Sequence, residues 1–257
     1  MAIHTAEPHA HSAHHWEWSW APAAISVGIL CLSLTIPMYF VYEAKLAAII
    51  FAGVSVPLIL AGIANWMSGP GPEPTDLKLN SLTLTLFILS EGLIFFAMFI
   101  AYYFLRISAG QEDQPWPPAG TPEINQQLAV ISTGVLILSA MIYNFAEKKF
   151  ESSKGAFSIL LLLAIVLGSA FIGSTVYEYS HLLAEGFKPG TNAYSTPFYT
   201  LTGFHAAHIL VGVGAFLVIF FGTIIGKVHP SFVRLAGVYW NFVTLLSFFV
   251  VTQVYFW

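Results

Sequence analysis

The chain has 257 residues, of which 57% are hydrophobic and only 9% are charged, and its formal net charge is −4. A soluble domain usually carries about 25% charged residues, so this composition excludes a water-soluble protein and indicates one that lies in a membrane. Nine Lys and Arg residues without a basic cluster also exclude a nucleic-acid-binding protein.

The chain opens with a histidine-rich tail over residues 1–20, for which two interpretations are open. The tail could form a weak, labile metal site, or it could stay solvated and disordered because no scaffold would fix the ligands. Three tryptophans end the tail, as expected for an anchor at the membrane interface. We expect no cleavable signal peptide, because no Lys or Arg precedes the first apolar run. The histidines of the tail are His4, His9, His11, His14 and His15.

Seven apolar stretches follow, each long enough to provide the about twenty residues with which a helix crosses a bilayer. A Pro- and Gly-rich loop over residues 68–78 divides them into transmembrane helices 1–2, over 21–67, and a five-helix bundle over 79–257. The sequence therefore predicts an all-α, polytopic membrane protein of seven transmembrane helices in a two plus five arrangement. The predicted spans are 21–41, 44–67, 79–106, 127–147, 155–181, 196–226 and 231–257.

The basic residues of the short loops predict that the N-terminus lies inside and the C-terminus outside. Lys and Arg concentrate in loops that remain on the cytoplasmic side of a membrane. With this orientation the inner loops hold more of them than the outer loops. The inner set is Lys78, Lys148, Lys149, Lys154, Lys227 and Arg234, and the outer set is Lys45, Arg106 and Lys188.

Small residues inside the spans are interpreted as packing positions. Cys31 is the only cysteine, which excludes an intrachain disulfide, a cysteine-rich iron–sulfur site, a c-type haem attachment and a dinuclear copper centre with paired thiolates. The glycines of "GSAFIGS" (168–174) and "GVGAF" (212–216) would let neighbouring helices approach closely.

Four ionisable residues fall inside the predicted spans, namely Glu91, Glu178, His205 and His208, and His181 lies near a span end. Ionisable residues in a membrane are costly and mark functional sites by default. At a rise of 1.5 Å per residue, Glu91 and both histidines of the sixth span lie roughly 14–18 Å deep, near the middle of the membrane. We therefore expect Glu91 to pair with one or both of them. Glu178 and His181 are expected near the outer interface, within reach of headgroups or water.

Several ligands are conceivable for the histidine pair. His205 and His208 are spaced i, i+3 and are expected on one helix face, where a metal would also need Glu91. A bis-histidine haem needs its ligands on different helices, and no other span supplies a histidine at this depth. A hydrogen-bonded structural network and a site for a lipid or hydrated polar group remain the alternatives, because buried polar groups need partners.

Four motifs resemble subunit III of the haem–copper oxidases, the cytochrome c oxidase family, and its bacterial members in particular. They occur in the family's order: "FILSEGLIFFAMFIAYYF" (87–104), "GSTVYEYSHLL" (173–183), "YSTPFYTLTGFHAAHILVG" (194–212) and "AGVYWNFV" (236–243). The resemblance implies seven helices with the N-terminus inside, and a V-shaped lipid cleft between the first two helices and the other five. It also implies a multi-pass protein of the bacterial inner (cytoplasmic) membrane.

The resemblance further implies a subunit without a catalytic or metal-binding residue and without a redox centre of its own. The haems and copper would lie in partner subunits. The subunit would pack directly on subunit I, beside subunit II and other small subunits, would bind phospholipids, and would support proton uptake during the reduction of oxygen to water. The residues that match the motifs, Glu91, Glu178, His181, His205 and His208, are then expected in lipid binding or in a buried polar network.

The chain departs from the family pattern in its last span. The family's Tyr-Trp-His-Phe-Val-Asp has Asn241 and Thr244 at the His and Asp positions here, and Arg234 replaces a glutamate. Two alternatives stay open. One is subunit III of a quinol oxidase. The other, from a different class, is an independent membrane transporter that uses Glu91, His205 and His208, although neither an internal repeat nor paired helix breaks support it.

Overall fold

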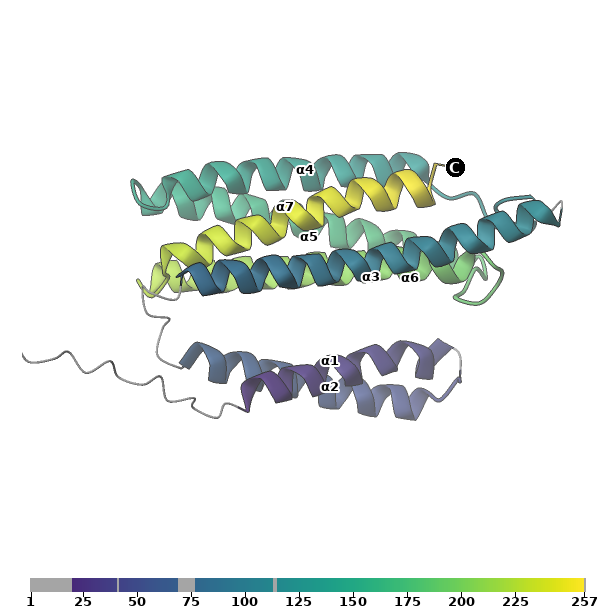
Figure 1. Ribbon diagram of the computed structural model, residues 1–257, viewed down its shortest axis with the longest axis horizontal. Helices are drawn as coiled ribbons and strands as arrows, with labels where there is room; N and C mark the ends of the chain where they lie inside the picture. Colours follow the sequence, from purple (N-terminus) through teal and green to yellow (C-terminus); the bar gives the residue numbers. More distant parts are fainter. Residues whose placement is uncertain (1–19, 41, 69–76, 113–114, 257) are drawn as a thin grey trace, which may run out of the picture. The chain divides into compact units, whose positions relative to one another are not determined.

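The computed structural model of the protein describes residues 20–40, 42–68, 77–112 and 115–256 (Figure 1). Within these residues the only regular elements are seven helices, which confirms the all-α prediction. The histidine-rich tail and most of the loop over 68–78 lie outside the described residues. The helices are α1 (Ala21–Phe40), α2 (Lys45–Ser68), α3 (Leu77–Gln111), α4 (Gln126–Lys149), α5 (Lys154–Ala184), α6 (Ser195–Ile224) and α7 (Pro230–Val254).

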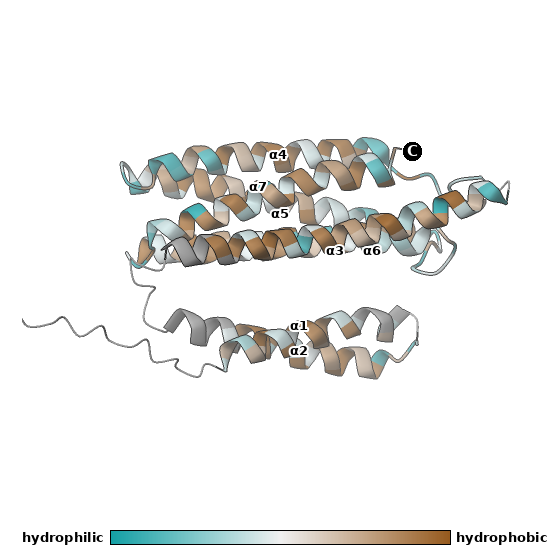
Figure 2. Cartoon of the chain, in the orientation of Figure 1, coloured by the Kyte–Doolittle hydropathy of each residue, from teal (hydrophilic) through white to brown (hydrophobic). Residues whose placement is uncertain are grey.

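The helix bounds agree with the predicted spans to within a few residues, except that α3 continues past residue 106 to Gln111. Among the described residues, α2 to α7 are long and apolar enough to cross a membrane. In α1 the corresponding apolar stretch, Ala21–Thr35, is shorter. Figure 2 shows hydrophobic residues along the helices and hydrophilic residues near the ends of α4. Short polar connections and long apolar helices are what a bilayer demands, because a helix satisfies its own backbone hydrogen bonds.

The chain divides into two compact units, Met1–Gly71 and Pro72–Trp257. The first unit is a hairpin of α1 and α2, whose close approach depends on glycine. A Cβ atom added at Gly28 would lie 2.6 Å from Cγ1 of Ile59, and one at Gly62 would lie 2.5 Å from Cγ1 of Ile25. The two helices thus pack glycine against isoleucine, as small-residue contacts do in membranes.

In the second unit, α4 packs against α5 and α7, α5 against α6, and α6 against α7, while α3 packs on α6 and α7. One buried cluster surrounds Trp240 and Phe216, and the other surrounds Phe198 and Tyr255. Apolar burial gives little driving force inside a bilayer, so these aromatic contacts act chiefly through van der Waals packing. Together they hold α6 at the centre of the unit, in contact with α3, α5 and α7.

Trp240 occupies a seat made by two glycines on neighbouring helices. A Cβ atom at Gly212 of α6 would lie 2.5 Å from the indole ring, and one at Gly168 of α5 would lie 2.9 Å from its far edge. The Trp240 Nε1–H donates to Ser139 Oγ at 3.3 Å. Of the predicted packing glycines, Gly173 and Gly214 have open space around the position of a Cβ atom, so only one glycine of each motif makes a close contact.

Candidate functional site

Glu91 and His208 meet across the contact between α3 and α6. Oε2 of Glu91 lies 3.1 Å from Nε2 of His208, and the two side chains are 16% and 10% exposed. Both residues lie well inside their helices. The equal depth that the sequence indicated for them is the depth at which their side chains touch.

The contact of the other ring nitrogen of His208, Nδ1, determines which protonation forms the Glu91–His208 pair can adopt. Nδ1 lies 2.7 Å from the carbonyl oxygen of Phe204, which can only accept, so Nδ1–H donates to it. Nε2 then either accepts from a protonated Glu91 or, in the imidazolium form, donates to the carboxylate. The two forms differ only in the position of one proton, and the pair is neutral in both. A neutral pair avoids an uncompensated charge inside a membrane span.

Aromatic rings surround the His208 imidazole. The rings of Phe204 and Phe95 approach it edge-on, with centroid distances of 4.6 and 5.3 Å. The Tyr239 hydroxyl donates to the backbone carbonyl of His208 at 3.1 Å. The ring is thereby packed in one orientation, which keeps Nε2 directed at Glu91.

Of the two histidines, His208 alone is hydrogen-bonded to Glu91 among the described residues, so the expected pairing with one or both is met by one. Three residues turn a helix by about 300°, which leaves about 60° between the two side chains. His208 thus meets Glu91, whereas His205 lines a cavity between α4, α5 and α7, with its ring edge-on to Phe95 of α3 at a centroid distance of 6.5 Å. His205 is 2% exposed. Within the described chain neither of its ring nitrogens has a hydrogen-bond partner.

Glu178 of α5 lies inside the bundle and is only 8% exposed. Its Oε2 accepts a hydrogen bond from the Tyr255 hydroxyl at 2.7 Å, and its Oε1 has no partner among the described residues. The carboxyl group is therefore turned into the bundle, and its expected position near the outer interface, within reach of headgroups or water, stays a prediction.

His181, less than one turn further along α5, is separate from these groups. Its side chain is 66% exposed, and Nε2 lies 3.2 Å from Oε1 of Glu185. It is thus not part of a buried polar network, because it lies on the outer face of α5 while Glu178 faces inward. An exposed pair of this kind contributes about 0–1 kcal/mol to stability.

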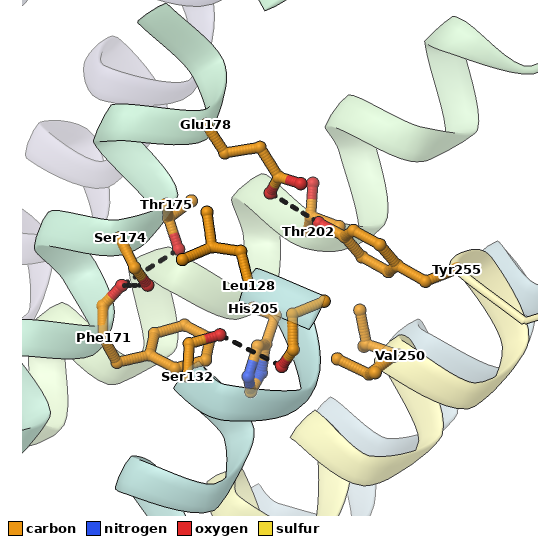
Figure 3. Close-up of a pocket in the computed structure, with 12 residues that line it drawn as sticks. Leu128, Ser132, Phe171, Ser174, Thr175, Glu178, Thr202, His205, Val250 and Tyr255 are labelled. Carbon is orange, nitrogen blue, oxygen red and sulfur yellow. Dashed lines mark hydrogen bonds between the residues drawn. The ribbon is translucent and has the colours of Figure 1, made fainter. Parts of the chain in front are cut away.

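A cavity of about 20 Å³ lies between α4, α5, α6 and α7, lined by Glu178 and His205 among others (Figure 3). Sequence reasoning missed the other polar residues of the lining because none of them is charged. They are Tyr255 and the hydroxyl residues Ser132, Ser174, Thr175 and Thr202. Within the part of the chain that the structure describes, no three His, Cys, Asp or Glu side chains are close enough together to hold a metal ion.

Comparison with known proteins gives a consistent result. A sequence model of the family described as cytochrome c oxidase subunit III matches residues 11–257. A probable cytochrome c oxidase subunit 3 of Nocardia farcinica (strain IFM 10152) is 34% identical over 178 residues, which cover 67% of this chain and 85% of the relative. A cytochrome c oxidase subunit 3 of Thermostichus vulcanus is 32% identical over 181 residues, covering 68% and 85%. One of Allomyces macrogynus is 27% identical over 244 residues, covering 89% and 88%.

Proposed function

Because the chain belongs to the cytochrome c oxidase subunit III family, we propose that it is the non-redox subunit III of an aerobic terminal oxidase that reduces oxygen to water and pumps protons. In this role it stabilises the catalytic subunit I, binds phospholipids and supports proton uptake. The haems and copper belong to partner subunits, and cytochrome c is the electron donor. The observation that carries the proposal is the 3.1 Å contact between Glu91 and His208, a pair of side chains that can share one proton inside the membrane without any redox group.

Lipid binding is supported by the surface of α3 beside Glu91. Large apolar side chains are exposed along this helix, whereas Glu91 itself keeps 16% of its side chain accessible. Acyl chains can cover the apolar residues, and a polar lipid group or water can reach the carboxyl group. The exposed residues include Leu86, Leu89, Leu93, Phe96, Ile100 and Phe104.

Direct packing on subunit I is supported by an amide pair on α4 and α7. Asn144 and Asn241 exchange two hydrogen bonds of 3.1 Å, and Asn241 is exposed although it lies inside a membrane span. A groove of about 370 Å³ lies beside them, with Met141, Thr244 and Phe248 in its lining. Exposing an amide group to hydrocarbon is costly, and hydrogen bonds between helices commonly stabilise helix association in membranes. A transmembrane helix of subunit I is the occupant that fits this groove.

We place the protein in the bacterial inner (cytoplasmic) membrane as a multi-pass subunit with its N-terminus inside. The distribution of Lys and Arg in the short loops supports this orientation. The division of the chain into two compact units supports the proposed two plus five grouping of the helices, because each unit has its own internal packing.

Purification of the native complex through a tag on the full chain tests the proposal. We expect subunits I and II to copurify, and we expect the absorption spectrum of the complex to show haem. The chain purified without its partners should show no Soret band. Recovery of the chain alone from a gently solubilised membrane, or stoichiometric haem on the isolated chain, would contradict the proposal.

A further inference from the structure

Two buried side chains that line the cavity between α4, α5, α6 and α7 have polar atoms without a hydrogen-bond partner among the described residues. They are the His205 ring, with both nitrogens unpaired, and Oε1 of Glu178. Each residue is more than nine-tenths buried, and both line the cavity. A buried polar atom without a hydrogen bond forfeits its interaction with water, so such atoms are rare in stable proteins. These three atoms therefore indicate a ligand that can hydrogen-bond inside the cavity.

The remaining polar lining supplies hydrogen-bond acceptors. Four hydroxyl groups each donate to a backbone carbonyl one turn earlier in the same helix, at 2.6–3.2 Å. Their hydrogens are therefore engaged, and each oxygen keeps at least one lone pair, although Thr202 Oγ1 already lies 2.6 Å from the Tyr179 hydroxyl. A ligand that can donate a hydrogen bond to one of these oxygens and also accept one from the imidazole matches this lining. The four hydroxyl residues are Ser132, Ser174, Thr175 and Thr202.

The size of the cavity limits the ligand. The cavity has about 20 Å³, and a single water molecule needs about 10–15 Å³ of such space. We propose that this cavity is an internal water site, in which ordered water hydrogen-bonds the His205 ring, Oε1 of Glu178 and the lining hydroxyl oxygens. Water both donates and accepts, which matches the lining. A lipid headgroup or a substrate of several heavy atoms is too large.

The water site connects four helices through polar contacts. Ser132 belongs to α4, Glu178 to α5, His205 to α6 and Tyr255 follows α7, so water held among them links all four helices. Interhelical hydrogen bonds contribute measurably to association inside a bilayer. The inference is independent of the proposed oxidase role, because it depends only on packing within Pro72–Trp257.

A high-resolution cryo-EM map of the complex that contains the full chain tests the site directly. We expect separate density within hydrogen-bonding distance of a ring nitrogen of His205. A well-defined His205 ring with no such density would overturn the proposal. Density surrounded by five or more oxygen atoms at metal–oxygen distances would also overturn it, because the occupant would then be a cation.

Solid-state NMR of the full chain in lipid bilayers, with ¹⁵N-labelled histidine and tryptophan, gives a second measurement. We expect faster transfer of magnetisation from water to the His205 ring than to the indole N–H of Trp240, which donates to Ser139 in the packed core. Equal transfer to both would overturn the proposal. Comparison with the His205→Gln variant assigns the signal, because the histidine signal that is missing from the spectrum of this variant belongs to the His205 ring.

Discussion

Replacement of Gly212 by alanine should disrupt the seat of Trp240. The added methyl carbon would lie 2.5 Å from two atoms of the indole ring, whereas ordinary contacts between carbon atoms are about 3.5–4.0 Å. The ring would have to move by about 1 Å. It cannot move freely, because the adjoining edge of the same six-membered ring, Cη2 and Cζ2, already packs on Gly168 and its Nε1–H is bonded to Ser139.

The size of the effect follows from two opposed terms. Overpacking a filled core costs about 1–3 kcal/mol, and this rigid contact belongs at the upper end of that range. Alanine in place of glycine inside a helix returns about 1 kcal/mol. We therefore expect Gly212→Ala to lower the free energy of unfolding by about 2 kcal/mol, a factor of about 30 in the ratio of folded to unfolded protein.

Equilibrium unfolding of the purified full chain in mixed micelles of increasing SDS content measures this difference. Gly214→Ala is the matched control, because Gly214 lies on the same helix and a Cβ atom there has nothing within 4 Å. The control should be unchanged or should gain up to about 1 kcal/mol. If the free energy of unfolding fell by the same amount in both variants, or fell in neither, the packing of Trp240 could not be the reason for glycine at position 212.

Three further changes test the polar groups. Tyr255→Phe removes the donor to Oε2 of Glu178 and should lower the free energy of unfolding by about 1–3 kcal/mol in the same assay. An unchanged free energy of unfolding would contradict that hydrogen bond. Asn241→Leu should leave the isolated chain folded but reduce the yield of copurified subunit I, measured by mass spectrometry; an unchanged yield would remove the groove from the proposed interface. Glu91→Gln keeps a partner for His208, so the haem spectrum of the complex should stay unchanged while its phospholipid content falls, and loss of haem would contradict a non-redox role.

The depth of Glu91 and His208 was predictable because both helices are long and regular. A constant rise per residue converts sequence position into height within the membrane. Height does not determine which neighbour a side chain meets, and that is why the sequence left open whether one or both histidines pair with Glu91. The direction of a side chain around α6 has meaning only once α3, α5 and α7 are placed, and contacts between residues far apart in sequence place them.

The same limit applies to the two glycine motifs and to Tyr255. Gly168 and Gly212 could not be distinguished from Gly173 and Gly214 in the sequence, because Trp240, which selects them, lies on another helix. The link between Tyr255 and Glu178 joins residues 77 positions apart, and neither composition nor periodicity indicates it. Helix length, type and order were thus encoded locally, whereas the partners of buried polar atoms depend on tertiary packing.

The two histidines of α6 give the helix two polar sides with different access to the surroundings. On the α3 side, Glu91 and His208 remain 16% and 10% exposed, and within the described part of Pro72–Trp257 α3 packs on α6 and α7, so whatever covers its remaining surface can act on the shared proton. On the other side, His205 is 2% exposed and enclosed by α4, α5 and α7. A lipid bound along α3 can therefore alter the Glu91–His208 pair directly, whereas it can influence His205 only through protein side chains, such as Phe95 of α3, whose ring centroid lies 6.5 Å from that of His205. A change in lipid that left the water contact of His205 intact while it altered the His208 ring signal would demonstrate this separation.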